Sequence, residues 1–261
     1  MCLIAFDYRP RAATPLRLIA NRDEQHARPA AALDFWGDVP DILGGRDLQA
    51  GGSWLAVHRS GRLAAVTNVR DPRIEVAPDA PSRGELVRGA LECADLEIWL
   101  KELAASEARR YAGFNLLAGR LDANGLALWH LHRGYREIAL GRITPGLHGI
   151  SNASLDTAWP KLLKACQGLE TSLVGNAWPD AALETMRDDR IIEDAARLPD
   201  TGVGLALERR LSPPFILGDV YGTRATTWVS WHANGEIEIG ERRFGPEGVF
   251  LGETRQCMQT R

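Results

Sequence analysis

The first stretch of the sequence reads MCLIAFDYRPRAATPLRLIANRDE over residues 1–24. Its two short apolar runs, residues 1–7 and 16–24, are rich in residues that favour strands, and the segment between them contains Pro10 and Pro15. This pattern predicts an antiparallel hairpin whose first strand holds the N-terminus inside a sheet. Because antiparallel pairing brings the start of one strand to the end of the other, we expect Cys2 to lie close to the polar residues 21–24.

A cysteine at the second position can become the first residue of the mature chain, because an initiator methionine is usually removed before a small residue. Cys2 would then carry a thiol and a free α-amine, whose reference pKa of about 7.7–8.0 suits a general base near neutral pH. Arg22, close by in the hairpin, would favour the thiolate. Taken alone, Cys2 is more typical of a small buried hydrophobic residue on a strand.

Length and composition indicate one globular domain. The 261 residues contain no linker rich in proline, glycine or serine, so we expect a single domain over residues 1–261. The 31 basic and 34 acidic residues are well mixed and give a net charge of −3, which argues against a nucleic-acid partner. Four dispersed cysteines argue against disulfides and a zinc site, and no apolar run suits membrane insertion. We expect a protein of the reducing cytoplasm.

Three further pairs of β-type runs each flank a short turn containing glycine. They are residues 53–58 with 62–68, 114–119 with 126–131, and 226–231 with 236–239. The last two pairs are joined through Asn124-Gly125 and Asn234-Gly235, the strongest local signal for a hairpin. These pairings predict antiparallel sheets of about eight strands. Residues 25–52 are rich in turn formers and are predicted to be a long loop, either a lid or a wall of a binding site.

Helical patterns fall between the hairpins rather than alternating with single strands. A capping box at Ser82–Glu85 opens one helix, and a second is predicted over residues 96–110. A third starts at Thr157-Ala158-Trp159-Pro160 and is predicted to stop at Gly168. Shorter helical patterns cover residues 180–186 and 188–198. Because amphipathic helices must cover sheet faces, we expect an α+β fold with two stacked sheets and the helices outside.

Polar residues lie at the margins of the predicted strands. Asn68, Asn152 and Arg224 each stand at the end or start of a β-type run, and each alone is more typical of a turn. Together with Cys2 and Arg22 they form a set in which every member has a chemical role. The amides could hold an oxyanion, and the arginines could bind an anionic group of a substrate.

Short motifs spread over nearly the whole chain resemble those of one known family. They are Met1-Cys2, Asn21-Arg22-Asp23-Glu24, GGSWLAV over 51–57, Thr67-Asn68-Val69-Arg70, PSRGELV over 81–87, YAGFNL over 111–116, GISNASLD over 149–156 and Tyr221-Gly222-Thr223-Arg224. They are similar to motifs of the NRDE family, also called the transport and Golgi organisation protein family. More distantly, the layout resembles N-terminal-nucleophile hydrolases of the choloylglycine hydrolase and penicillin V acylase type. That resemblance implies a four-layer αββα sandwich with two mainly antiparallel sheets.

The distant resemblance also implies a catalytic set. Cys2 would be nucleophile and base, with Arg22 as the cation beside it. Asn68 and Asn152 would take the oxyanion-binding and amine-orienting roles, and Arg224 would complete the site.

The catalytic carboxylate departs from the pattern of those hydrolases, which carry it three residues after the arginine. Gln25 stands at that position in this chain, whereas Asp23 and Glu24 follow Arg22 directly. On a strand, Glu24 shares a face with Arg22 and Asp23 does not. Either carboxylate is therefore a candidate.

The resemblance implies two functions of different classes. The first is a cysteine hydrolase that acts on a linear amide or another acyl compound and needs no cofactor. The second is a haem or lipid carrier, because the NRDE family has been implicated in haem handling and lipid homeostasis. In the carrier, Cys2 or His148 would ligate iron, and Arg22 or Arg224 could pair with propionates. A lone histidine such as His148, placed before a glycine, is more typical of a loop.

Two further histidines share one face of a predicted strand. His130 and His132 could contribute to a metal site, but the sequence supplies no third ligand near them. They are therefore predicted to be surface residues, and no metal site is expected.

Overall fold

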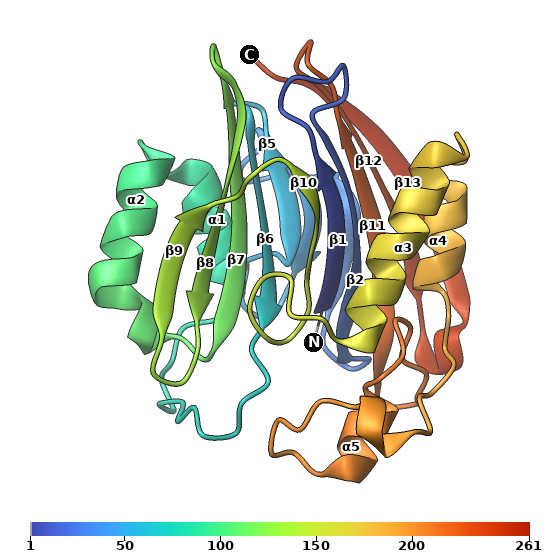
Figure 1. Ribbon diagram of the computed structural model, residues 1–261. Coiled ribbons are helices and arrows are strands. Elements are labelled where there is room, and N and C mark those ends of the chain that lie inside the picture. Colours follow the sequence, from blue (N-terminus) through green and yellow to red (C-terminus); the bar gives the residue numbers. More distant parts are fainter. Residues whose placement is uncertain (1) are drawn as a thin grey trace.

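The computed structural model describes residues 2–261, and of Cys2 it describes the backbone alone. Met1, and with it the expected removal of the initiator methionine, lies outside the described residues. The chain forms two sheets that face each other, with helices on both outer sides (Figure 1). This is the α+β, four-layer αββα sandwich predicted above.

Both sheets are antiparallel. The six-stranded sheet has the order β10-β1-β2-β11-β12-β13, and the seven-stranded sheet follows chain order from β3 to β9. The strands of the first sheet are β1 (Cys2–Tyr8), β2 (Leu16–Gln25), β10 (Gly146–Ile150), β11 (Tyr221–Trp231), β12 (Glu236–Phe244) and β13 (Phe250–Gln259). Those of the second are β3 (Ala30–Phe35), β4 (Ile42–Asp47), β5 (Leu55–His58), β6 (Arg62–Asn68), β7 (Phe114–Asp122), β8 (Gly125–Arg133) and β9 (Ile138–Arg142). All four predicted hairpins are present.

The helices cover the outer faces of the sheets. α1 (Gly84–Glu92) and α2 (Leu96–Glu102) lie on the seven-stranded sheet, and α3 (Pro160–Val174) and α4 (Asp180–Met186) lie on the six-stranded sheet (Figure 1). α5 (Leu205–Arg210) lies at the end of the molecule where β1 begins. Short π or 3-10 turns occupy Leu103–Glu107, Ala108–Arg110, Ala195–Arg197 and Pro246–Gly248. Within residues 2–261, no helix combines the length and apolar character that crossing a membrane requires.

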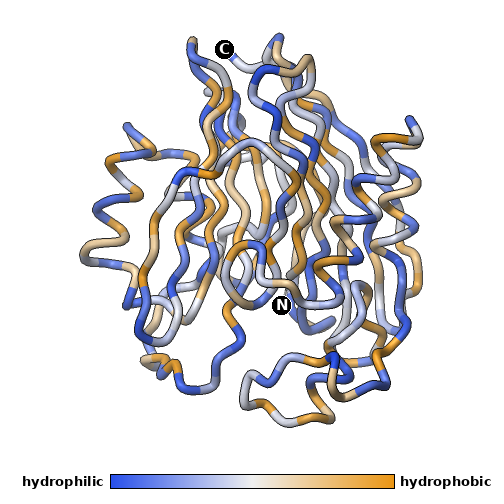
Figure 2. The backbone as a smooth tube through the Cα atoms, viewed as in Figure 1, coloured by the Kyte–Doolittle hydropathy of each residue, from blue (hydrophilic) through white to orange (hydrophobic). Residues whose placement is uncertain are grey.

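The first hairpin is buried on both faces. Ile4 and Phe6 of β1 belong to the core between the sheets, whereas Leu3 and Ala5 pack against α3 and α4. This follows from the period of two along a strand, which sends alternate side chains to opposite faces. Figure 2 shows the resulting concentration of hydrophobic residues along the central strands. Because burial of one large apolar side chain contributes about 1.5–3 kcal/mol, the hairpin is firmly anchored.

The prediction of a long loop over residues 25–52 is wrong, because this segment contains β3 and β4. Its buried Leu33 and Leu43 belong to the inter-sheet core. The glycines that indicated turns are instead required by close packing. A β-carbon on Gly44 would lie 2.5 Å from Cβ of Ala56, and one on Gly45 would lie 2.2 Å from the Trp54 ring. The sequence also did not predict β9 and β13. The structure therefore contains more strands than the expected number of about eight.

The third helix also differs from its prediction. α3 does not stop at Gly168 but continues to Val174. A β-carbon on Gly168 would lie 2.3 Å from Oγ1 of Thr185, so this glycine allows α4 to pack closely on α3. The predicted helix over residues 188–198 is reduced to the 3-10 turn Ala195–Arg197.

Replacing Gly168 by alanine is therefore expected to lower the free energy of unfolding by about 1–3 kcal/mol, because the added methyl group overpacks the α3–α4 contact. Urea unfolding of the purified variant measures this change. Gly37→Ala is a suitable control, since nothing lies within 4 Å of a β-carbon there. Equal stability of the two variants would contradict the packing role of Gly168.

Candidate functional site

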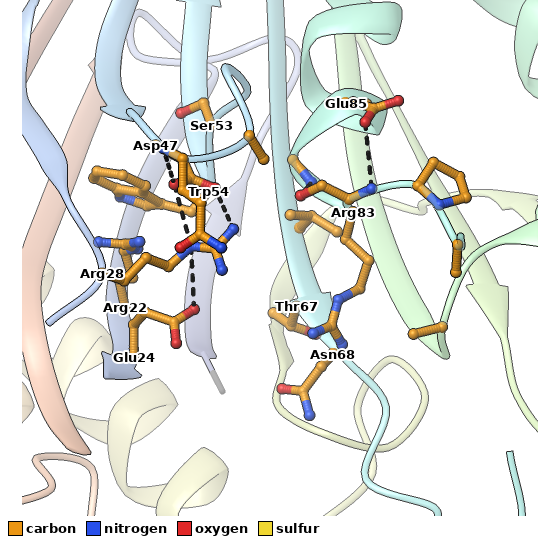
Figure 3. A pocket seen from close by; sticks show the side chains of 18 of the residues that line it. Arg22, Glu24, Arg28, Asp47, Ser53, Trp54, Thr67, Asn68, Arg83 and Glu85 are labelled. Carbon is orange, nitrogen blue, oxygen red and sulfur yellow. Dashed lines mark hydrogen bonds and ion pairs between the residues drawn. The ribbon is translucent and has the colours of Figure 1, made fainter. Parts of the chain in front are cut away.

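A cavity of about 650 Å³ opens between the sheets at the ends of β2 and β6. Its charged lining residues include Arg22, Arg28 and Arg83 as well as five carboxylates. The carboxylates are Asp23, Glu24, Asp47, Asp79 and Glu85. Figure 3 shows two facing walls, with Arg22 and Arg28 on one side and Arg83 on the other. The cavity therefore suits a polar small molecule.

Arg22 joins the two sheets at this cavity. The backbone of Cys2 pairs directly with Arg22 in the β1–β2 ladder, as the sequence predicts, whereas the Cys2 side chain lies outside the described residues. The Arg22 guanidinium carbon lies 4.0 Å from the centroid of the Trp54 ring. Trp54 directly precedes β5 of the seven-stranded sheet, whereas Arg22 belongs to β2 of the six-stranded sheet. Stacking on an aromatic face holds a guanidinium in place while it keeps its charge.

The two candidate carboxylates occupy different environments. Asp23 is 2% exposed and accepts a hydrogen bond of 2.6 Å from the Thr223 hydroxyl, which a β-bulge in β11 places opposite it. Burial raises the pKa of Asp23, and the positive charges of Lys161 and Arg70 oppose that rise. Glu24 lines the cavity as well, but it is only half-buried and lies 4.0 Å from Nε of Arg28. Asp23 is therefore the carboxylate in the buried network beside the start of β1.

Asn68 and Asn152 form one hydrogen-bonded pair. Asn152 is 1% exposed, and its amide nitrogen donates to Oδ1 of Asn68 over 2.9 Å. Its own oxygen accepts from Lys161 Nζ at 3.0 Å and from Arg70 at 3.2 Å. Because the oxygen of Asn68 is engaged, its amide nitrogen is the group that can donate into the cavity that Asn68 lines.

Three buried charged residues that the sequence analysis did not select support this pair. Lys161 is 3% exposed at the start of α3, and Arg70 forms an ion pair with Glu208 of α5. Glu208 also accepts hydrogen bonds from the backbone and the hydroxyl of Thr201. Among these three residues, only Arg70 could have been suspected from the sequence, because it belongs to the motif Thr67-Asn68-Val69-Arg70. These contacts connect β6, α3 and α5 around Asn152.

The structure does not bring Arg224 into this network. Its guanidinium donates to the backbone oxygens of Gln25, the last residue of β2, and of Arg28, three residues further on. Arg28 in turn forms an ion pair of 2.6 Å with Asp47 in the cavity wall. Arg224 therefore positions the wall that carries Arg28.

The predicted haem ligand His148 is engaged elsewhere. Its Nδ1 lies 2.7 Å from Asp156 and its Nε2 lies 2.9 Å from the oxygen of Thr144. His148 pairs with Phe6 in the ladder between β10 and β1. It is not among the residues that line the cavity.

The prediction that His130 and His132 lie on the surface is wrong, since each is 7% exposed. Both rings hydrogen-bond to Oδ1 of Asn115, at 3.0 Å for His130 and 2.7 Å for His132. The Asn115 amide nitrogen donates to Thr67 and to the backbone oxygen of Ala153. This buried cluster fixes the loop that carries Asn152.

Burial and the neighbouring His132 lower the pKa of His130 to about 4. Below about pH 6.5 the unfolded chain binds a proton at this residue, whereas the folded chain does not until about pH 4. The free energy of unfolding should therefore fall by about 3 kcal/mol as the pH drops through this window. Urea unfolding at several pH values measures this fall, which should be smaller in His130→Gln. An unchanged pH dependence in that variant would contradict the assignment.

Possible metal ligands gather away from the cavity. In the part of the chain that the structure describes, one group has its ligand atoms within 4.8 Å of one another, namely Glu236, Glu238 and Cys257. This group lies on β12 and β13, and none of its members lines the cavity.

Comparisons with known proteins agree with the fold and the motifs. Residues 1–246 match the family model described as Transport and Golgi organisation 2. The chain is 35% identical to the Transport and Golgi organization 2 homolog of Mus musculus, and the match covers 97% of each protein. It is 34% identical to the Homo sapiens homolog, and that match covers 98% of this chain and 97% of the human protein.

A solved structure shares the fold. The conjugated bile acid hydrolase of Clostridium perfringens, in its C2A mutant form, superposes with a TM-score of 0.52. It covers 98% of this chain and 92% of its own, at 7% sequence identity. The likeness confirms the predicted N-terminal-nucleophile-hydrolase-like sandwich, and the family match confirms the resemblance found in the motifs. The chain belongs to the Transport and Golgi organisation 2 family.

Proposed function

We propose that this protein is a cysteine hydrolase of the N-terminal-nucleophile type that acts on a linear amide or a related acyl compound. One observation carries the proposal: Arg22, Asp23, Asn68 and Asn152 gather at the edge of the sandwich where β1 begins with Cys2. The polar cavity at that edge offers room for a small substrate. One solved structure that shares the fold is that of a conjugated bile acid hydrolase.

The proposed reaction begins with removal of Met1, which gives Cys2 a free α-amine. Cys2 pairs with Arg22 in the ladder, and Asp23 is the next residue of β2. The guanidinium of Arg22 favours the thiolate, and the carboxylate of Asp23 holds the amine by charge and hydrogen bonding. The amine takes the thiol proton and the thiolate attacks the substrate carbonyl.

Attack converts the carbonyl into a tetrahedral oxyanion, which the amide nitrogen of Asn68 stabilises. Asn152 acts as a positioning residue, because it holds Asn68 by a hydrogen bond of 2.9 Å. The carbon–nitrogen bond then breaks, and the α-ammonium group gives its proton to the leaving amine. Water, deprotonated by the same α-amine, attacks the resulting thioester and releases the carboxylic acid and the free thiol.

Liquid chromatography coupled to mass spectrometry tests this proposal with a panel of linear N-acyl amides. We expect the protein to release the acid and the amine in equal amounts from at least one amide class. Asn68→Ala should lower this rate by about 10²–10³-fold, the usual effect of removing one oxyanion donor. Absence of turnover across amide, ester and thioester panels, with Met1 removed, would overturn the proposal.

A further inference from the structure

The four strands at the sheet edges differ in how well they are protected. β9 and β10 have five residues each, and β3 has six residues with a shift in its register. β13 has ten residues, and almost all of them are partly or fully exposed. Long, exposed edge strands pair readily with other chains unless proline, lysine or a bulge blocks them. The ladder between β12 and β13 shifts its register at the first end of β13, where Leu251 has no directly paired residue. From Gly252 to Gln259 the pairing is regular, and this part of β13 contains neither proline nor lysine.

The charges of β13 are arranged symmetrically about Thr254. Glu253 stands on one side of it and Arg255 on the other. If a second copy of β13 pairs antiparallel with Thr254 opposite Thr254, each Glu253 faces the partner's Arg255. Opposite charges directly across a ladder stabilise pairing, and like charges destabilise it. The edge is therefore complementary in charge to itself.

Exposed apolar residues lie at the N-terminal end of β13. The exposed fractions of Val249, Phe250 and Leu251 are 59%, 57% and 57%. In the symmetric register, Gly252 would lie opposite the partner's Gln256, and Val249, Phe250 and Leu251 would follow directly beyond the regular part of the ladder. Because each copy contributes this apolar segment, pairing would bring exposed apolar surface against the partner at both ends of the ladder.

We propose that β13 binds a second copy of this chain, antiparallel, with the two-fold axis at Thr254. The two six-stranded sheets would then continue into one another across the dimer. β13 lies at the outer edge of its sheet (Figure 1), and none of its residues lines the cavity. Dimerisation through β13 therefore does not depend on the proposed hydrolysis, and the loss of either activity would leave the other unaffected.

Charge reversal tests the register by sedimentation equilibrium of the full chain over a range of concentrations. We expect a reversible dimer for the native protein. Glu253→Arg and Arg255→Glu should each weaken it about tenfold or more, because both symmetric ion pairs become like-charge pairs. The double variant should recover most of the affinity, since the opposite charges face each other again. Circular dichroism melting checks that each variant is folded.

Disulfide cross-linking tests whether the two-fold axis passes through Thr254. In a Cys257→Ser background, Thr254→Cys should form a disulfide between two copies under mild oxidation, because directly opposed residues lie within disulfide distance. Gln256→Cys is the matched control and should not cross-link, since it would face Gly252 of the partner subunit. A protein that stays monomeric at all concentrations would overturn the proposal. So would a dimer whose affinity is unchanged by both charge reversals and which forms no disulfide through Thr254→Cys. Binding of an unrelated extended peptide to β13 in place of a second copy would also overturn it.

Discussion

Replacing Cys2 by alanine is expected to lower amide hydrolysis by about 10⁴-fold or more, because the proposed nucleophile is removed while the rest of the site remains. Alanine at the second position is small enough to allow removal of Met1, so the variant keeps a free α-amine. The measurement is the rate of amine release at saturating substrate. Any residual rate would report the contribution of Arg22 and Asn68 to binding and polarisation.

Two matched variants make this result specific. Cys2→Ser keeps a nucleophilic atom with a free α-amine and should retain a small part of the activity. Cys257→Ala removes the exposed thiol of β13 and should leave the rate unchanged. Full activity of Cys2→Ala would rule out the catalytic role of Cys2, whatever the substrate.

Replacing Arg70 by leucine is expected to lower the free energy of unfolding by about 3–5 kcal/mol. Arg70 and Glu208 are 8% and 2% exposed, so the substitution leaves a buried carboxylate without its cation. It also removes the 3.2 Å hydrogen bond from Arg70 to the oxygen of Asn152. Urea unfolding followed by circular dichroism measures the loss, and it should be accompanied by lower activity because Asn152 positions Asn68.

A second substitution separates the buried charge from lost packing. Arg70→Leu with Glu208→Leu should be clearly more stable than Arg70→Leu alone, because no charge is then left unpaired. Arg73→Leu breaks the exposed ion pair with Asp71 and should change stability by no more than about 0.5 kcal/mol. A loss below about 1 kcal/mol for Arg70→Leu would contradict the role given to this pair.

The layered fold could be predicted from the sequence because its main strands carry strong local signals. The first hairpin consists of two apolar runs around a turn with two prolines, and two later hairpins turn at Asn-Gly. The sequence did not indicate β4, because Gly44 and Gly45 are typical of turns. In the structure these two glycines leave room for the side chains of Ala56 and Trp54. The sequence did not indicate β13 either. Because both faces of this strand are largely exposed, residues Gly252–Gln256 lack the alternation of apolar and polar residues that is typical of a half-buried strand.

The candidate site could be predicted only in part. Arg22, Asn68 and Asn152 stand at strand margins and in recognisable motifs, and the structure places them at one edge. Lys161 could not be found, because a single lysine in the first turn of an amphipathic helix normally faces water. Its burial depends on Asn152, which lies in a different element. Whether Asp23 or Glu24 enters the buried network likewise depended on the bulge in β11 that aligns Thr223.

The intact mass of the protein, measured before and during turnover, tests the catalytic role of Cys2 more directly than any substitution. We expect the purified protein to have lost Met1. During turnover we expect a transient increase in mass equal to the acyl group, mapped to the N-terminal peptide and absent from Cys2→Ala. Retention of Met1 in an active enzyme, or an acyl group mapped to another residue, would show that the amine and thiol of Cys2 do not perform the reaction.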